Sequence, residues 1–140
     1  MNFIEILPQL LINLLSLYKK NIKLDDLTFP QIIGLYIIPF DGTEISILSK
    51  KVGSDISTIS RLVDGLEKKE LVKRINSGLD KRVVNVLLTI KGEEIRKELE
   101  EQFDQVGNLI EEKIDLKSIK TNENMLSKLN WEVSKVLLEN

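Results

Sequence analysis

The sequence predicts a mainly α-helical protein with a small β-hairpin, in the order α-α-α-α-β-β-α-α. Apolar residues recur at intervals of three and four over much of the chain, which is the period of a half-buried helix. Two β-rich runs, residues 71–75 and 82–88, flank the sequence NSGLD at residues 76–80, a composition typical of a turn. The length of 140 residues, 42% of them hydrophobic, predicts a single domain over residues 1–140.

The first helix, over residues 2–20, is the most apolar part of the chain. Its apolar core is too short to cross a bilayer, and it lacks the basic start and the cleavage site of a signal peptide. A cytoplasmic protein without membrane contact is therefore expected. Because apolar residues surround this helix almost completely, another surface must cover it, and a partner subunit is expected to do so.

The second helix is marked by its sequence at both ends. Thr28 precedes Gln31 by three residues, which is the pattern of a capping box. Pro30 suits the first turn, where its nitrogen needs no hydrogen-bond partner. Pro39 and Gly42 then stop the helix.

Two shorter helices follow, over residues 45–52 and 56–69, joined by a tight turn at Gly53 and Ser54. Asp55 is the expected N-cap of the second of them. The two faces of that helix differ in polarity, with Ile56, Ile59, Leu62, Val63 and Leu66 on one face and Ser57, Arg61, Asp64 and Lys68 on the other.

Two longer helices complete the chain, one over residues 90–113 with Thr89 as its cap and one over residues 122–138. Charge is distributed unevenly before and along the first of them. Residues 50–82 contain nine basic and five acidic residues, a local charge of +4, whereas residues 91–115 contain four basic and nine acidic residues, a local charge of −5. The chain is therefore polarised although its net charge is only −2. The local charge matters more for binding a nucleic acid than the net charge does.

Cysteine and histidine are both absent from the sequence. A disulfide, a thiol nucleophile and a Ser-His-Asp triad are thereby excluded, and zinc or haem would lack their usual ligands. No polar pair stands at catalytic spacing either. The sequence predicts a protein that is not an enzyme and that has no metal site and no cofactor.

A helix-turn-helix followed by a basic hairpin is the element order of a winged helix-turn-helix, which binds double-stranded DNA. Small residues at the start of the second helix let it enter the major groove closely, and an arginine there can bind guanine O6 and N7. The N-terminus of that helix also favours phosphate. The hairpin lies beside it, within reach of the flanking backbone or minor groove. The candidate DNA-binding residues are Ser57, Thr58, Ser60, Arg61, Asp80, Lys81 and Arg82.

Three motifs occur in a single order: LSKKVGSDISTISRLVDGLEKKELVKR at 48–74, DKR at 80–82 and LTIKG at 88–92. Together they resemble the MarR (multiple-antibiotic-resistance regulator) family of transcription factors. The resemblance covers about residues 27–100. It implies a winged helix-turn-helix lobe over residues 27–89 and a helical dimerisation region over residues 1–22 and 90–140. It also implies a homodimeric regulator, more specifically a repressor, on a pseudo-palindromic operator.

Other interpretations stay open from the sequence alone. The same winged fold also serves as a protein–protein interaction module without DNA binding, because fold alone does not decide function. Lys68, Lys69, Lys73 and Arg74 fit either solubilising charge or phosphate contact. Gly65 departs from the family pattern, where an arginine or another long residue is more common.

The resemblance further implies a crevice between the lobe and the dimerisation region, where a small molecule often regulates family members. Here its expected lining is nearly all aliphatic, with two tyrosines and no nearby arginine or histidine to hold an anion. The lining residues are Leu14, Leu17, Tyr18, Ile33, Tyr36, Ile37 and Phe103. Such a lining favours filled core over an open pocket. The sequence therefore identifies no effector and no ligand-binding residues.

Overall fold

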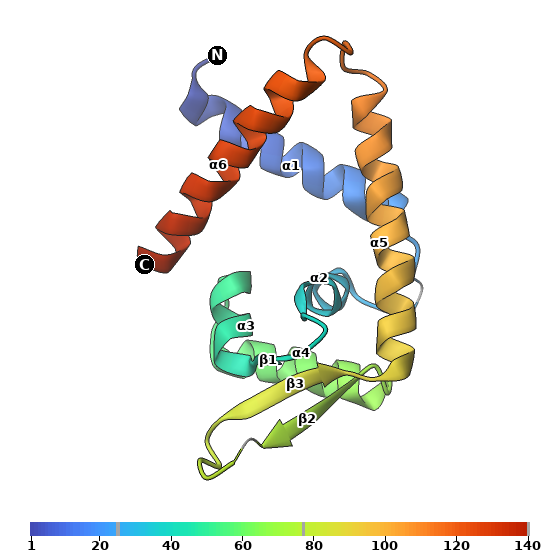
Figure 1. The fold of residues 1–140 in the computed structure, drawn as a ribbon, viewed down its shortest axis with the longest axis vertical. Coiled ribbons are helices and arrows are strands. Elements are labelled where there is room, and N and C mark those ends of the chain that lie inside the picture. Colours follow the sequence, from blue (N-terminus) through green and yellow to red (C-terminus); the bar gives the residue numbers. More distant parts are fainter. Residues whose placement is uncertain (25, 77, 140) are drawn as a thin grey trace.

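A computed structural model describes residues 1–24, 26–76 and 78–139 of the chain (Figure 1). Ser77 of the predicted turn and Asn140 at the end of the predicted dimerisation region lie outside the described residues. The elements are α1 (Phe3–Asn21), α2 (Phe29–Ile37), β1 (Thr43–Glu44), α3 (Ile45–Val52), α4 (Ile56–Lys68), β2 (Val72–Asn76), β3 (Val84–Leu88), α5 (Ile90–Glu111) and α6 (Ile119–Glu139). The predicted mainly α-helical fold with a small β-hairpin is confirmed.

The sheet has three antiparallel strands in the order β1-β3-β2, rather than the two strands of the predicted hairpin. The additional strand, β1, pairs Thr43 with Val86 and Glu44 with Asn85, so the element order becomes α-α-β-α-α-β-β-α-α. The predicted run at 82–88 also starts too early. The backbone N–H of Arg82 donates to the side chain of Asp80, so this residue belongs to the turn and β3 begins two residues later.

Side chains close in sequence define the ends of the lobe helices. Thr28 and Gln31 form the predicted capping box, with side-chain to backbone hydrogen bonds of 3.3 and 3.1 Å. Gly53 ends α3 with φ of 70°, a left-handed conformation that costs glycine little. Asp55 caps α4 by accepting the backbone N–H of Thr58 at 2.6 Å. These local bonds set the tight turn that holds α3 against α4.

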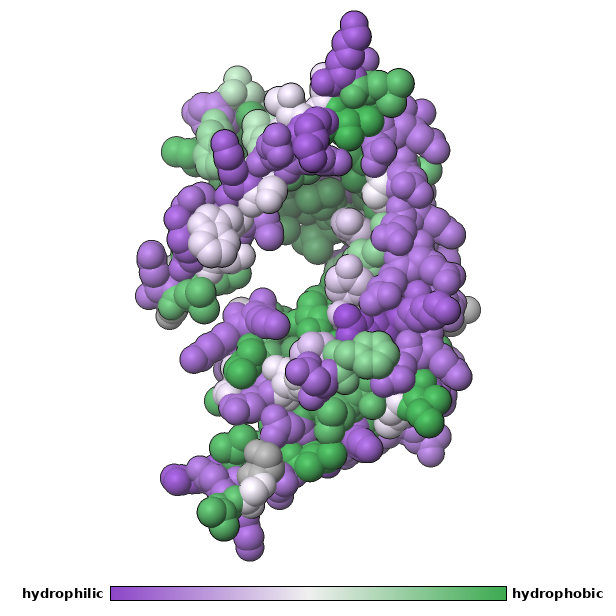
Figure 2. Space-filling view, in the orientation of Figure 1, coloured by the Kyte–Doolittle hydropathy of each residue, from purple (hydrophilic) through white to green (hydrophobic). Residues whose placement is uncertain are grey.

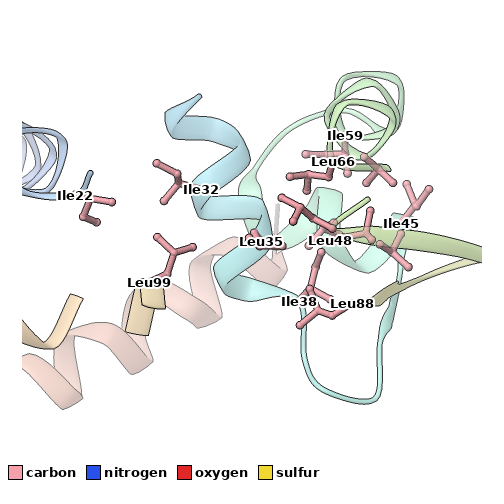
Figure 3. Close-up of a cluster of buried hydrophobic side chains, with 14 residues drawn as sticks. Ile22, Ile32, Leu35, Ile38, Ile45, Leu48, Ile59, Leu66, Leu88 and Leu99 are labelled. Carbon is pink, nitrogen blue, oxygen red and sulfur yellow. The ribbon is translucent and has the colours of Figure 1, made fainter. Parts of the chain in front are cut away.

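The hydrophobic core lies between α2, α3, α4 and the sheet (Figure 3). The apolar face of α4 contributes Ile59, Val63 and Leu66, all of them buried, as its spacing predicts. Ile56 was predicted on the same face but is 57% exposed, because it stands in the first turn of α4, ahead of the packed residues. The fully buried side chains of this core include Leu35, Ile38, Leu48, Ile59, Val63, Leu66, Val72 and Val86.

The winged lobe, residues 28–88, is joined rigidly to α5 through the first turn of that helix. Thr89 caps α5 through the backbone N–H of Gly92 at 3.0 Å, and its hydroxyl donates to the carbonyl oxygen of Glu70 at 2.6 Å. A Cβ atom on Gly92 would lie 1.9 Å from the carbonyl oxygen of Leu71, so only glycine allows this close approach. The orientation of the lobe relative to α5 is therefore set by direct backbone packing.

Outside the lobe, α1, α5 and α6 form an open frame (Figure 1). Neither α1 nor α6 contains a buried residue, although both carry many large hydrophobic side chains. Figure 2 shows hydrophobic surface above and below an opening that separates this part from the lobe. Within the three described segments, no helix is both long and apolar enough to cross a membrane.

Candidate nucleic-acid interface

The first turn of α4 is organised by the carboxylate of Asp55. One of its oxygens, Oδ1, accepts the backbone N–H of Thr58 at 2.6 Å and the hydroxyl of Ser57 at 2.8 Å. The Thr58 N–H is the main cause that lowers the pKa of Asp55 to about 2, and the Ser57 and Thr58 hydroxyls add to it. Asp55 is therefore ionised at neutral pH. The Thr58 N–H, one of the donors expected to favour phosphate at this helix terminus, is already used.

Arg61 lies one turn further along α4 and is exposed to solvent. Its Nε donates to the carbonyl oxygen of Ser57 at 3.4 Å, which directs the side chain along the helix toward its N-terminus. Its positive charge also contributes to the low pKa of Asp55. Ser57, Thr58 and Arg61 thus form one exposed polar surface at the start of α4.

The wing presents a second arginine, whose base is held by an acidic neighbour. The Oδ1 atom of Asp80 accepts the backbone N–H of Arg82 at 3.0 Å and its Nε at 3.2 Å. The side chain of Arg82 is nevertheless 93% exposed. The carboxylate therefore orients the base of the guanidinium while its outer part extends into solvent. Lys81 lies beside it and is also exposed.

The start of α4 and the base of the wing border one open groove of about 240 Å³. Ile56 and Ser60 line it from α4, and Arg82, Val83 and Val84 line it from the wing. Of the candidate residues, Ser60 and Arg82 therefore line the same groove, although they are 22 residues apart in the sequence. Glu44, Ile45 and Ser46 complete its lining. Ile56 is an exposed apolar residue in this region, although its spacing predicts it on the apolar face of α4.

A third arginine, Arg74, fastens the wing to α4 instead of facing outward. It pairs with Asp64 at 2.7 Å and Glu67 at 3.3 Å, and it donates to the carbonyl oxygen of Ser60 at 2.8 Å. It also donates to the Ser60 hydroxyl at 3.2 Å, so this hydroxyl is directed toward β2. Ser60, a predicted DNA-binding residue, thus supports the wing, and Arg74 is a structural residue of the lobe.

The remaining basic candidates lie elsewhere on the lobe. Lys69 is half-buried at the opposite end of α4, where its Nζ donates to Gln31 Oε1 at 3.1 Å. Lys68 and Lys73 are exposed. No group of three or more acidic, histidine or cysteine side chains in the described residues is arranged to hold a metal ion.

Aromatic side chains lie in the region where the resemblance implies a crevice. Phe103 of α5 stacks on Tyr36 of α2 with ring centroids 4.3 Å apart, and it contacts Tyr18 of α1 at 5.0 Å. Burial raises the pKa of the Tyr18 hydroxyl, and the neighbouring Tyr36 raises it further. Phe103 thus packs against both tyrosine rings between α1, α2 and α5, and Tyr36 remains 37% exposed.

Comparison with known proteins agrees with this geometry. The family model described as MarR family matches residues 28–84, which run from the capping box of α2 to the first residue of β3 and make up most of the winged lobe. The HTH-type transcriptional regulator MgrA of Staphylococcus aureus is 34% identical over 91 residues, which cover 64% of this chain. Residues 28–84 are a MarR-family domain. The match covers 61% of MgrA, so the chain spans about three fifths of the length of that curated relative.

Solved structures of FabT and of MarR have the same fold over nearly the whole chain. Streptococcus pneumoniae FabT in complex with DNA superposes with a TM-score of 0.76 at 20% identity, covering 94% of this chain and 95% of FabT. The apo form of MarR from E. coli superposes with a TM-score of 0.80 at 22% identity, covering 92% of this chain and 96% of that structure. The long helices outside the matched lobe therefore also follow the MarR fold.

The departure of this chain from the MarR pattern at Gly65 has a local explanation. A Cβ atom at this position would lie 2.5 Å from Nε2 of Gln31. That glutamine completes the capping box of α2 and accepts a hydrogen bond from Lys69. The side chain of Gln31 therefore occupies the space that a longer residue at position 65 would take.

Proposed function

We propose that this protein is a sequence-specific DNA-binding transcriptional regulator, acting as a repressor. One observation carries the proposal: α4 and the wing border one groove, lined by Ile56 and Ser60 of α4 and by Arg82, which Asp80 orients. The exposed Ser57, Thr58 and Arg61 lie on the same first turns of α4. An α-helix that presents small polar residues and an arginine fits the major groove, and a basic hairpin beside it fits the adjacent backbone or minor groove. The match of residues 28–84 to the MarR family supports the same conclusion, as does a shared fold with FabT in its DNA complex.

In the proposed complex, Arg61 binds guanine through its guanidinium, and Ser57 and Thr58 contact neighbouring base edges. Lys81 and Arg82 contact DNA beside the major groove. Arg82 is held at its base by Asp80, so less rotamer freedom is lost when it binds.

The proposal includes a homodimer, because the long helices are incomplete as a single chain. Large apolar residues of α1 and α6 stay exposed, among them Phe3, Ile4, Leu11, Ile12, Trp131, Val136 and Leu138. Exposed apolar surface on this scale marks an interface. A symmetric dimer would place two copies of α4 on two half-sites about one helical turn apart, so the operator would be a pseudo-palindrome.

The test is selection of bound duplexes from a random library, followed by affinity measurements on the selected sequence. We expect a two-fold symmetric motif. Arg61→Ala should weaken binding by roughly 1–3 kcal/mol and relax the preference at one base per half-site. Arg82→Ala should weaken binding to all sequences more evenly and reduce the salt slope by about one. Lys97→Ala, an exposed cation on the outer part of α5, serves as the matched control and should change neither.

Absence of any enriched motif would refute DNA recognition. The winged lobe would then be better described as a protein–protein interaction module, the second function that this fold serves.

A further inference from the structure

The hydrogen bond between Ser57 and Asp55 has a defined direction. The Oγ atom of Ser57 lies 2.8 Å from Oδ1 of Asp55. An ionised carboxylate has no proton to give, so the serine hydroxyl must be the donor. A serine hydroxyl has a single proton and two lone pairs. Once its proton is directed at Asp55, Ser57 can offer an approaching base only an acceptor.

Major-groove edges differ in the groups that could use such an acceptor. Cytosine presents the N4 amino group and adenine presents the N6 amino group, both of which are donors. Guanine presents N7 and O6, and thymine presents O4 and a methyl group, so neither has a donor there. We propose that Asp55 is a positioning residue that makes Ser57 an obligate acceptor, so that the base facing Ser57 is selected as cytosine or adenine. This inference rests on the proposed function.

Two features keep the arrangement in place. The backbone N–H of Thr58 binds the same oxygen of Asp55 at 2.6 Å, which fixes the carboxylate over the first turn of α4. The low pKa of Asp55 keeps it ionised throughout the neutral range. For Ser57 to donate to a base instead, it would have to leave a charge-assisted hydrogen bond, which is stronger than a bond between neutral groups.

Arg61 supplies the opposite chemistry on the same surface. A guanidinium has only donors, so it recognises the acceptors of guanine. Its Nε is directed to the carbonyl of the same Ser57, one turn away. The start of α4 therefore offers one acceptor-only group and one donor-only group side by side. Each half-site should therefore contain one position, facing Ser57, that is restricted to cytosine or adenine. A second position, facing Arg61, should be guanine.

The experiment compares four proteins on the selected operator and its single-base variants: wild type, Asp55→Asn, Ser57→Ala and the double variant. Wild type should prefer adenine or cytosine over guanine or thymine at one position per half-site by about tenfold or more. Asp55→Asn should reduce this ratio at least about fivefold, because its neutral amide oxygen holds the Ser57 hydroxyl less strongly than the carboxylate does and lets it turn to donate to a base. Ser57→Ala should abolish the ratio, and the double variant should match Ser57→Ala.

The readout is a ratio between bases, which a general loss of helix stability would not change. An effect of Asp55→Asn that persists in the Ser57→Ala background would overturn the inference, as would an equal weakening on every sequence. A guanine or thymine preference at this position in the wild type would do the same. If Asp55→Asn does not fold, Asp55→Ser preserves an N-cap and carries the same expectation. A wild type without any motif would refute the proposed function itself, and is thereby distinguished from these outcomes.

Discussion

Arg74 and Arg82 lie on the same wing, but removing their charge is expected to affect different properties of the protein, fold stability for Arg74 and DNA binding for Arg82. Methionine is the substitution of choice at both positions, because it keeps the length of the apolar stem and loses the guanidinium. Arg74→Met removes the link between β2 and α4, whereas Arg82→Met removes an outward-facing cation. The first should destabilise the fold, and the second should weaken DNA binding without destabilising it.

The contacts of Arg74 determine the size of the expected loss. Its hydrogen bond to the Ser60 carbonyl at 2.8 Å is charge-assisted and worth roughly 1.5–3 kcal/mol in a half-buried site. The pairs with Asp64 and Glu67 add less, because those carboxylates are 51% and 43% exposed and each contributes roughly 0–1 kcal/mol. Arg74→Met should therefore lower the free energy of unfolding by about 2–3 kcal/mol. Arg82→Met, at 93% exposure, should change it by less than about 0.5 kcal/mol.

Urea unfolding followed by far-ultraviolet circular dichroism measures both values, with all proteins at one concentration because the stability of a dimer depends on it. Affinity for the selected operator supplies the second comparison, in which Arg82→Met should show a reduced salt slope. Equal stability losses in the two variants would refute this reasoning. So would an Arg74→Met protein as stable as the wild type, since the ion pairs would then contribute nothing to holding the wing.

Three other predictions follow from the packing. Gly92→Ala should lower the free energy of unfolding by about 1–3 kcal/mol, because its Cβ would lie 1.9 Å from the carbonyl oxygen of Leu71. Gly107→Ala is the matched control in the same helix, because a Cβ there meets no atom within 4 Å. It should raise the free energy of unfolding by about 0.5–1 kcal/mol. Equal changes in stability for the two variants would contradict both predictions. Because Phe103 packs against Tyr18 and Tyr36 between α1, α2 and α5, millimolar salicylate should shift operator affinity less than about tenfold, or 1.4 kcal/mol of coupling. A larger shift at constant pH and ionic strength would show an open site. Sedimentation at micromolar concentration should give a dimer. Trp131→Glu, at a residue of α6 that is 65% exposed, should shift the protein toward monomer. A monomeric wild type would exclude the dimer.

The sequence by itself determined the features whose causes lie within a turn or two of chain. The capping box of Thr28 and Gln31, the left-handed Gly53 and the N-cap Asp55 each depend on neighbours three or fewer residues away. The buried face of α4 follows from its apolar period. The orientation of Arg82 by Asp80 is likewise an interaction between residues two apart.

Only the tertiary structure decided the features that depend on distant partners. Strand β1 has two residues, too few to show any period, and it is a strand because β3 offers it a hydrogen-bonding edge. From the sequence, Arg74 fits a surface residue. Its partners Asp64 and Ser60 come within reach only because β2 packs against α4. The direction of the Ser57 hydroxyl could be assigned only from the distance between its Oγ atom and the Asp55 carboxylate. A backbone turn can be inferred from its own residues, but the partner of a side chain depends on which segments the whole fold brings together.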